Sequence, residues 1–183
     1  MPRVLIPLAE GFEELEAITL IDLLRRAKIE VVTASLQAGE VRASRGTRHL
    51  ADVELDAVLA EPFDMVVLPG GLPGAEHLNA DPRIHTLLKR VAGEGGYTAA
   101  ICAAPRVLAD AGLLQGRSAT SYPGFLTAQD AQLSEQAVVQ DGKVITSRGP
   151  GTAMDFALYL IETLTDRATR DAVEAGLVRT EAQ

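Results

Sequence analysis

The chain has 183 residues, of which 47% are hydrophobic and 23% charged, which suffices for one sizeable core and excludes a disordered or collagen-like chain. Its 17 basic and 25 acidic residues give a net charge of −8, which argues against partners such as nucleic acid or an anionic membrane. A single cysteine excludes an intramolecular disulfide, and with only three histidines beside it we expect no structural zinc site.

Targeting segments are not expected. The apolar run at residues 4–6 stops at Pro7 and acidic residues follow, which is not the pattern of a signal peptide. No stretch reaches the roughly 18 uninterrupted apolar residues of a membrane span. We therefore expect a cytoplasmic protein with a single domain over residues 1–183.

Short apolar runs alternate with helical patterns from the N-terminus onward. Strands are expected at residues 4–6, 31–34, 65–68 and 98–101, and helices at 13–26, 81–92 and 105–111. Asp81 and Pro82 suit the N-cap and the first position of a helix. The alternation predicts an α/β fold with a mostly parallel sheet and helices on both faces.

Two later segments have a different character. Residues 138–140 and 143–146 flank Asp141-Gly142, which predicts a small antiparallel hairpin. A helix is expected at 152–164, where Thr152 and Asp155 suit a capping box. Apolar residues cover most of its circumference, so we expect it to be buried on several sides.

Cys102 is the first candidate for chemistry. It lies where the strand at 98–101 meets a helix, and in doubly wound sheets reacting groups gather beyond the carboxyl ends of strands. Its alanine neighbours suit a tight strand-to-helix elbow, and a helix N-terminus favours the thiolate. Free cysteine is also among the most buried residue types, so the local sequence leaves a structural thiol equally open.

Glu16 is the second candidate, because it falls with Glu13 inside the apolar arc of the helix at 13–26. A carboxyl group in apolar surroundings has a raised pKa and can donate a hydrogen bond at neutral pH. Acidic residues in a first helical turn are also expected as partners of the helix dipole, and the isolated residue does not decide between the two.

Gly70 and Gly71 follow the strand at 65–68. Glycines there let backbone N–H groups approach a ligand as an oxyanion or anion site, although many such loops are simply turns. The loop lacks the spacing of nucleotide-binding motifs. His49, His77 and His85 lie away from the strand ends, and the spacings of metal hydrolases are absent, so we expect no metal site.

Four segments carry a family resemblance. They are Gly11-Phe12-Glu13-Glu14-Leu15-Glu16, Val67-Leu68-Pro69-Gly70-Gly71, Ala100-Ile101-Cys102-Ala103-Ala104-Pro105 and Thr146-Ser147-Arg148-Gly149-Pro150-Gly151-Thr152. Together they resemble the ThiJ/PfpI superfamily over nearly the whole chain, closest to the group of the parkinsonism-associated protein deglycase. The resemblance implies a flavodoxin-like three-layer sandwich, a single domain of the class I glutamine amidotransferase-like type, a homodimer and no cofactor.

The resemblance also implies the site. It places Cys102 at a strained elbow, hydrogen-bonded by a protonated Glu16, and it implies oxyanion donors in the backbone N–H groups of Gly71 and Ala103. Relatives contribute an arginine near the site across the dimer, and Arg45 matches that position.

Tyr122 marks a departure from the family, because many relatives carry a histidine before Pro123. A tyrosine with an ordinary pKa near ~10 is a poor general base, but it can donate a hydrogen bond or shape a pocket. We therefore expect a cysteine-dependent enzyme acting on small reactive carbonyls, of the glyoxalase or deglycase type, and not a Cys-His protease. The alternative is a redox sensor or stress-response chaperone, in which Cys102 is oxidised and turnover is slight.

Overall fold

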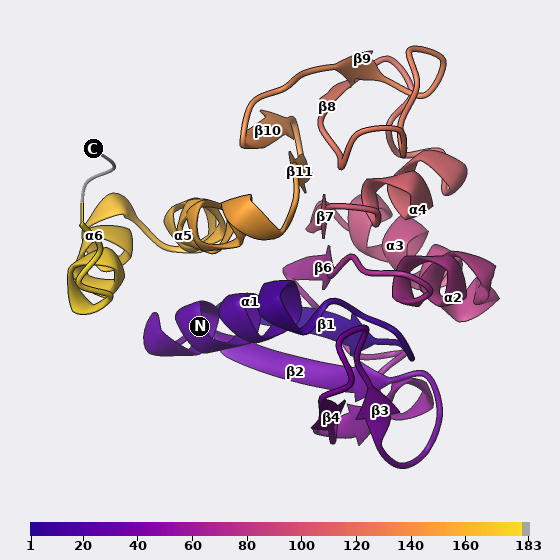
Figure 1. Cartoon of the computed structure of the whole chain (residues 1–183), viewed down its shortest axis with the longest axis horizontal. Coiled ribbons are helices and arrows are strands. Elements are labelled where there is room, and N and C mark those ends of the chain that lie inside the picture. The colour runs from indigo at the N-terminus through magenta and orange to yellow at the C-terminus, as the bar shows by residue number, and fades with distance from the viewer. Residues whose placement is uncertain (181–183) are drawn as a thin grey trace.

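A seven-stranded sheet forms the centre of the computed structural model, which describes residues 1–180 (Figure 1). Across the sheet the strands are β10 (Val138–Asp141), β11 (Val144–Ser147), β7 (Tyr97–Ile101), β6 (Met65–Leu68), β1 (Arg3–Leu8), β2 (Glu30–Ser35) and β5 (Val53–Glu54). Neighbouring strands are parallel, except that β10 runs antiparallel to β11. The last three residues of the expected domain, 181–183, lie outside the described part.

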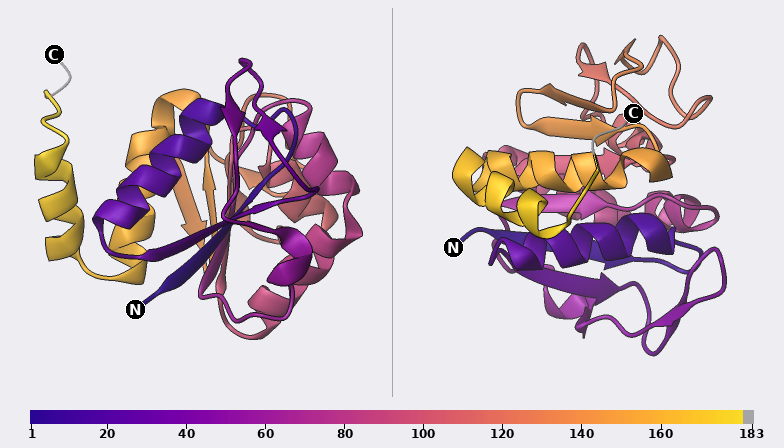
Figure 2. Two further views of the ribbon diagram at one scale, coloured as in Figure 1. Left: turned by 90° about the horizontal axis from the view of Figure 1, so that it is seen from below. Right: turned by 60° about the vertical axis from the view of Figure 1, so that its left-hand side comes forward.

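Helices cover both faces of this sheet (Figure 2). On one face α1 (Glu14–Arg26) packs against α5 (Ala153–Leu164), and α6 (Arg167–Gly176) packs on α5. On the other face lie α2 (Gly74–Ala80), α3 (Pro82–Gly93) and α4 (Pro105–Asp110). The predicted three-layer sandwich with a mostly parallel sheet is confirmed.

The central strands explain this arrangement. β1, β6 and β7 have strands on both sides and helices on both faces, so their interiors are buried apolar runs without polar alternation. The helix α3 begins as expected, because Asp81 caps it by accepting a hydrogen bond from the Arg83 N–H at 2.9 Å. The helix α5 is buried on several sides, as its apolar circumference predicted, because α1 and α6 both pack on it.

Several short elements were not predicted. They are the edge strand β5, the β3 (Val41–Arg42) and β4 (Arg48–His49) hairpin, the parallel pair β8 (Ser118–Ala119) and β9 (Gln132–Leu133), and the 3-10 turns η1 (Leu55–Ala57) and η2 (Pro150–Thr152). Two- and three-residue elements are too short to show a hydrophobic period. The helices α2 and α6 were missed as well.

Two details of the C-terminal third differ from expectation. The capping box at Thr152 and Asp155 is wrong, because the Thr152 hydroxyl bonds to the Ser147 hydroxyl at 2.7 Å and accepts from the Gly149 N–H at 3.1 Å. Asp155 instead pairs with Arg179 at 2.8 Å. The hairpin forms, but its second strand β11 continues the parallel sheet beside β7, so only β10 is antiparallel.

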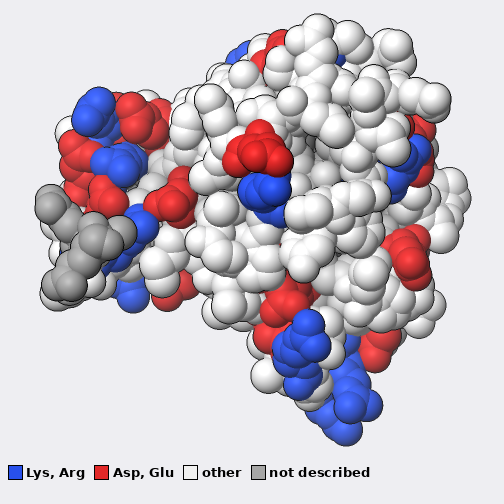
Figure 3. Space-filling view, turned by 45° about the horizontal axis from the view of Figure 1, so that its top comes forward, with Lys and Arg blue, Asp and Glu red and all other residues white. Residues whose placement is uncertain are grey.

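Charged side chains are unevenly distributed over the surface (Figure 3). They gather on α6 at the left of that view, where Arg170 pairs with Asp171 and Glu174, and over the β3–β4 hairpin at the bottom. The face between these two regions carries few charges. Within residues 1–180, no helix combines the length and the apolar character needed to cross a bilayer.

Candidate active site

The strand order reverses beside β1, which has β2 on one side and β6 on the other. In open α/β sheets, ligands bind at such a switch point, outside the carboxyl ends of the strands. The segments that leave these ends carry Glu13 after β1, Gly70 and Gly71 after β6, and Cys102 after the neighbouring β7. The topology therefore gathers the candidate residues at one edge of the sheet.

Cys102 lies at a strained elbow between β7 and α4. Its φ of +64° is in the left-handed region, which residues with a side chain seldom occupy. The Cys102 N–H donates to the Ser147 carbonyl at 3.0 Å, and the Cys102 carbonyl accepts from the Tyr122 N–H at 2.8 Å. Both backbone groups of the elbow are thus fixed by neighbouring segments, and the side chain is only 9% exposed.

Gly70 explains how a thiol and a carboxyl group fit together here. A Cβ at this position would lie 2.7 Å from the Cys102 Cβ and 2.7 Å from Glu16 Oε2, so no side chain can be accommodated. The Gly70 N–H donates to the same Glu16 oxygen at 2.7 Å. The backbone after β6 therefore contacts both functional side chains.

Glu16 projects from α1 into this space and is fully buried. Burial raises the pKa of Glu16 to about 7, and the negative charge of Glu13 adds to the rise. The Gly70 N–H and the Cys102 thiol oppose the rise in pKa, because both stabilise the carboxylate. Glu16 can therefore exchange a proton near neutral pH.

Cys102 is shifted in the same direction. Burial, followed by the charge and the hydrogen bond of Glu16, raises the pKa of Cys102 to about 12. The backbone N–H groups of Gly71 and Ala103 interact with the sulfur and oppose this rise in pKa. The N–H group of Ala103, just before α4, favours the thiolate, as expected for a helix N-terminus, but burial and the neighbouring carboxyl group outweigh these donors.

The two groups therefore titrate as a pair. Burial raises the pKa of both groups, and the charge of Glu16 raises the pKa of Cys102 further, so ionisation of one group disfavours ionisation of the other. The buried pair can therefore hold a proton that the two groups exchange.

A cavity of about 310 Å³ opens above the Cys102 sulfur. One wall is polar: the Ser44 hydroxyl donates to Glu13 Oε2 at 2.9 Å, and Arg45 Nε lies 3.9 Å from the same oxygen. Tyr122 and Phe125 also line the cavity and form its aromatic wall. Arg45, expected to act across a dimer, lines the cavity of its own chain.

Every predicted site residue lies in or directly beneath this cavity. Gly71, Ala103, Tyr122 and Arg45 line it beside Cys102, and the rest of the centre, Glu16 with Gly70, lies beneath. Tyr122 is 48% exposed and forms part of a wall.

Four contributors were not among the predicted site residues. Glu13 had a detectable signal, since it lies three residues before Glu16 on one helix face, the spacing at which helical side chains become neighbours. Phe125 had a weaker sequence signal, because Pro123-Gly124 predicts a turn, and this turn brings Phe125 back toward Tyr122. Ser147 lies within the motif at residues 146–152, and Ser44 had no signal, because a hydrogen-bond partner far away in the sequence leaves no local pattern.

The histidines are all engaged elsewhere. The His49 ring packs against Phe12 with centroids 5.3 Å apart, His77 bonds to the Glu10 carbonyl, and His85 bonds to Asn79. Among residues 1–180, no histidine lines the cavity, and no cluster of three or more His, Cys, Asp or Glu side chains could hold a metal ion.

The chain is thus an α/β three-layer sandwich that carries a strained cysteine elbow and a buried glutamate at the switch point of its mostly parallel sheet. Residues 2–163 match the model of the DJ-1/PfpI family, and the chain belongs to that family. The resemblance drawn from the four sequence motifs is confirmed.

Individual relatives are similar to this chain over nearly their whole length. The chain is 41% identical to Parkinson disease protein 7 homolog of Danio rerio over 182 residues, which cover 96% of both chains. It is 38% identical to glutathione-independent glyoxalase DJR-1.2 of Caenorhabditis elegans over 163 residues, 88% of this chain and 87% of that one. The structure of Toxoplasma gondii DJ-1, oxidized, superposes with a TM-score of 0.93 at 40% identity, covering 98% of this chain and 100% of that chain.

Proposed function

We propose that this protein is a cysteine-dependent, cofactor-free enzyme of the glyoxalase type, which converts small 2-oxoaldehydes to 2-hydroxy acids. The observation that carries the proposal is the buried Cys102–Glu16 pair, which holds one exchangeable proton beside a cavity that opens on the sulfur. The name of the Caenorhabditis elegans relative, a glutathione-independent glyoxalase, supports it. Deglycase activity, on adducts of the same aldehydes, would use the same groups.

The first step is addition to the aldehyde. Glu16 takes the thiol proton, the Cys102 sulfur forms a bond to the aldehyde carbon, and the carbonyl π electrons move to oxygen. The N–H groups of Gly71 and Ala103, which already point at the sulfur, would stabilise the resulting alkoxide. Glu16 returns its proton to that oxygen, which completes a hemithioacetal and leaves Glu16 ionised for the next step.

The later steps move hydrogen within the adduct and then release it. Glu16 removes the proton from the former aldehyde carbon, which gives an enediol, and returns it to the adjacent carbon. The hydroxyl proton of the former aldehyde oxygen passes to the former ketone oxygen, so that a 2-hydroxy thioester is left on Cys102. Water cleaves the thioester to the hydroxy acid and restores the thiol. The sum is aldehyde plus water giving hydroxy acid, so no external oxidant or reductant is required.

Replacing the nucleophile tests the proposal. We expect Cys102→Ser to lower kcat/KM for methylglyoxal by at least about 10³-fold, since a serine hydroxyl at neutral pH is a far weaker nucleophile. Urea unfolding of the variant checks that the fold is retained. Full turnover by a folded Cys102→Ser protein would overturn the proposal.

A second candidate function uses the same thiol as a redox sensor or stress-response chaperone. A thiolate attacks a peroxide oxygen, water leaves, and a second peroxide converts the sulfenate to a sulfinate. The structure of the Toxoplasma gondii relative, which is described as oxidized, supports this second candidate. Uptake of two oxygens at Cys102 at low peroxide excess, with negligible aldehyde turnover, would select this function over the first.

We further propose that the protein acts as a homodimer in the cytoplasm. Leu15 and Ile18 are 51% and 41% exposed on α1, beside the β3–β4 hairpin, and form an apolar strip suited to a second copy. A single reactive thiol stays reduced in the cytoplasm. Sedimentation should give twice the chain mass, and Ile18→Glu should halve it; a monomeric native protein would contradict the dimer.

A further inference from the structure

The aromatic wall of the cavity is produced by a tight turn. The Phe125 N–H donates to the Tyr122 carbonyl at 3.2 Å, with Pro123 and a Gly124 of φ +91° between them, as in a type II turn. The turn returns Phe125 to the side of Tyr122, where the two ring centroids lie 6.2 Å apart at an interplanar angle of 75°. This edge-to-face pair presents an apolar surface to the cavity above Cys102.

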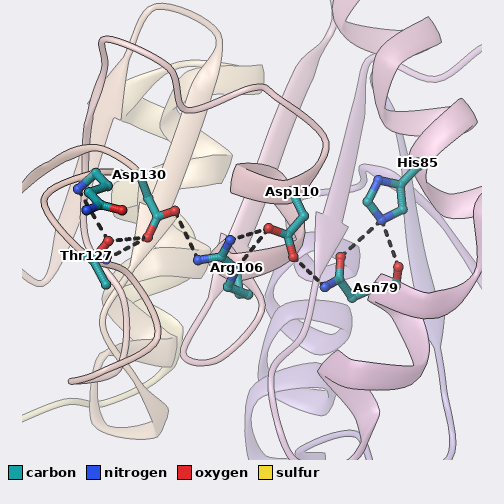
Figure 4. Close-up of polar contacts among 7 residues, drawn as sticks. Asn79, His85, Arg106, Asp110, Thr127 and Asp130 are labelled. Carbon is teal, nitrogen blue, oxygen red and sulfur yellow. Dashed lines mark hydrogen bonds and ion pairs between the residues drawn. The ribbon is translucent and has the colours of Figure 1, made fainter.

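The turn is attached to the reaction centre at two points. Its first residue, Tyr122, donates its N–H to the carbonyl of Cys102 itself at 2.8 Å. Further along the loop, Asp130 accepts from the Thr127 N–H and hydroxyl, both at 2.8 Å, and pairs with Arg106 of α4 at 3.0 Å (Figure 4). The loop is therefore tied to the helix that begins directly after the elbow.

The attachment continues beyond α4. Arg106 also pairs with Asp110, which accepts from the Asn79 amide of α2 at 2.7 Å, and His85 of α3 bonds to Asn79 in turn (Figure 4). This line of polar contacts connects the loop to three helices on one face of the sheet. The aromatic wall is thus held in place in the unliganded protein, and binding need not order it.

The two walls differ in what they can receive. The Arg45 side chain is 80% exposed and Glu13 accepts hydrogen bonds, so an apolar group placed there would strip water from charges without replacing its hydrogen bonds. The Phe125 ring has no polar group, so covering it removes no hydrogen bond to water, and the carbon atoms of the Tyr122 ring extend this apolar surface. An apolar substituent on a carbonyl held at Cys102 therefore belongs on the side of Tyr122 and Phe125.

The size of the cavity points the same way. The cavity, of about 310 Å³, leaves space beside a three-carbon aldehyde. An aryl substituent placed in that space would displace water from the aromatic surface.

We propose that Tyr122 and Phe125 form a subsite for the substituent of the carbonyl compound, and that this subsite selects aryl over methyl 2-oxoaldehydes. The substrate class rests on the proposed function, whereas the aryl preference rests on the cavity alone. Phe125 is accordingly a specificity-determining residue.

Alkylation of Cys102 by two matched reagents tests the subsite without requiring turnover. The reagents are 2-bromoacetophenone, with an aryl substituent, and bromoacetone, with a methyl group. In each reaction the sulfur–carbon bond forms as the carbon–bromine bond breaks, bromide leaves with the electron pair, and the thiol proton passes to solvent. Rates are divided by those of a small free thiol, which removes the intrinsic difference between the reagents.

We expect the ratio of the normalised alkylation rates, aryl over methyl, to be about 10 in the native protein and near one in Phe125→Ala. Phe125→Leu, which keeps apolar volume and removes the ring, should fall between them and guards against misfolding of the alanine variant. Leu133→Ala is the matched control, because Leu133 is an exposed apolar residue outside the cavity that follows the same loop. Its ratio should equal that of the native protein.

A native ratio near one, or a ratio that Phe125→Ala and Phe125→Leu leave unchanged, overturns the subsite. Turnover of phenylglyoxal and methylglyoxal is measured in parallel, and kcat/KM should favour phenylglyoxal. If neither aldehyde is turned over while the alkylation ratio behaves as expected, the proposed function is wrong and the aryl subsite stands.

Discussion

The reaction centre and the walls of the cavity are built in different ways. At the centre, Cys102 has a left-handed backbone, Gly70 has no room for a Cβ, and Glu16 is fully buried. On the walls, Arg45 and Tyr122 stand on loops with side chains 80% and 48% exposed.

This difference separates the chemistry from the choice of substrate. Close backbone approaches fix the geometry of the centre, so nearly any substitution there disturbs the proton shared by thiol and carboxyl group. Loop side chains can change without moving that pair, and Tyr122 in place of the histidine of many relatives is one such change. Substrate preference should therefore vary through the walls.

A reaction centre that tolerated a side chain at Gly70 would contradict this difference between the centre and the walls. In Gly70→Ala the added methyl must displace Cys102, Glu16 or the Ile101 carbonyl, which would lie 2.9 Å away. We expect kcat/KM for methylglyoxal to fall about 10²-fold, because displacements of about 1 Å at a reacting group cost that much. Overpacking should also lower the free energy of unfolding by about 1–3 kcal/mol.

Gly93→Ala is the matched control for this variant. Gly93 lies in α3 with nothing within 4 Å of an added Cβ, so alanine should raise helix stability slightly and leave turnover unchanged. Equal activity of the two alanine variants would show that the close approach at Gly70 has no functional role.

The buried carboxyl group should also make stability depend on pH. The pKa of Glu16 is about 7 in the fold and near 4.5 when exposed, so between these values the folded protein binds more protons than the unfolded chain. The stabilisation is complete below pH 4.5 and is lost as pH rises through 7. Its size is about 3 kcal/mol, at 1.36 kcal/mol per pKa unit.

Urea unfolding of the native protein and of Glu16→Gln between pH 5 and pH 8.5, a range set by the pKa of about 7, measures this loss. The unfolding free energy of the native protein minus that of Glu16→Gln should fall by about 3 kcal/mol as pH rises. Cys102 is present in both proteins, so ionisation of its thiol in the unfolded chain near pH ~8.5 largely cancels in the difference. Parallel stability curves would contradict a buried, titrating Glu16.

Much of the centre could be predicted from the sequence, and the walls largely could not. The strand ends and the helical arc placed Cys102, Glu16 and the glycine loop, because hydrophobic periods determine which residues leave a sheet edge or face a core. The family motifs then joined these residues into one site. The Pro123-Gly124 turn predicts a chain reversal at Phe125, but where that turn packs depends on the long-range pair between Arg106 and Asp130, which no local pattern encodes.

The same limit applies to electrostatics. The helix N-terminus suggested a resting thiolate, but the pKa of Cys102 is governed by its burial and by Glu16, which is distant in sequence. Proximity of this kind appears only once the fold brings α1 beneath the elbow.

The most direct test of the shared proton is the pH dependence of Cys102 alkylation by iodoacetamide in the native protein and in Glu16→Gln. The native rate should rise with an inflection near pH 7, where the pair loses its first proton, below the ~8.5 of an ordinary thiol. In Glu16→Gln the inflection should move above ~8.5, because only the buried thiol titrates. An unchanged profile in the variant, or a native inflection at or above ~8.5, would contradict the account.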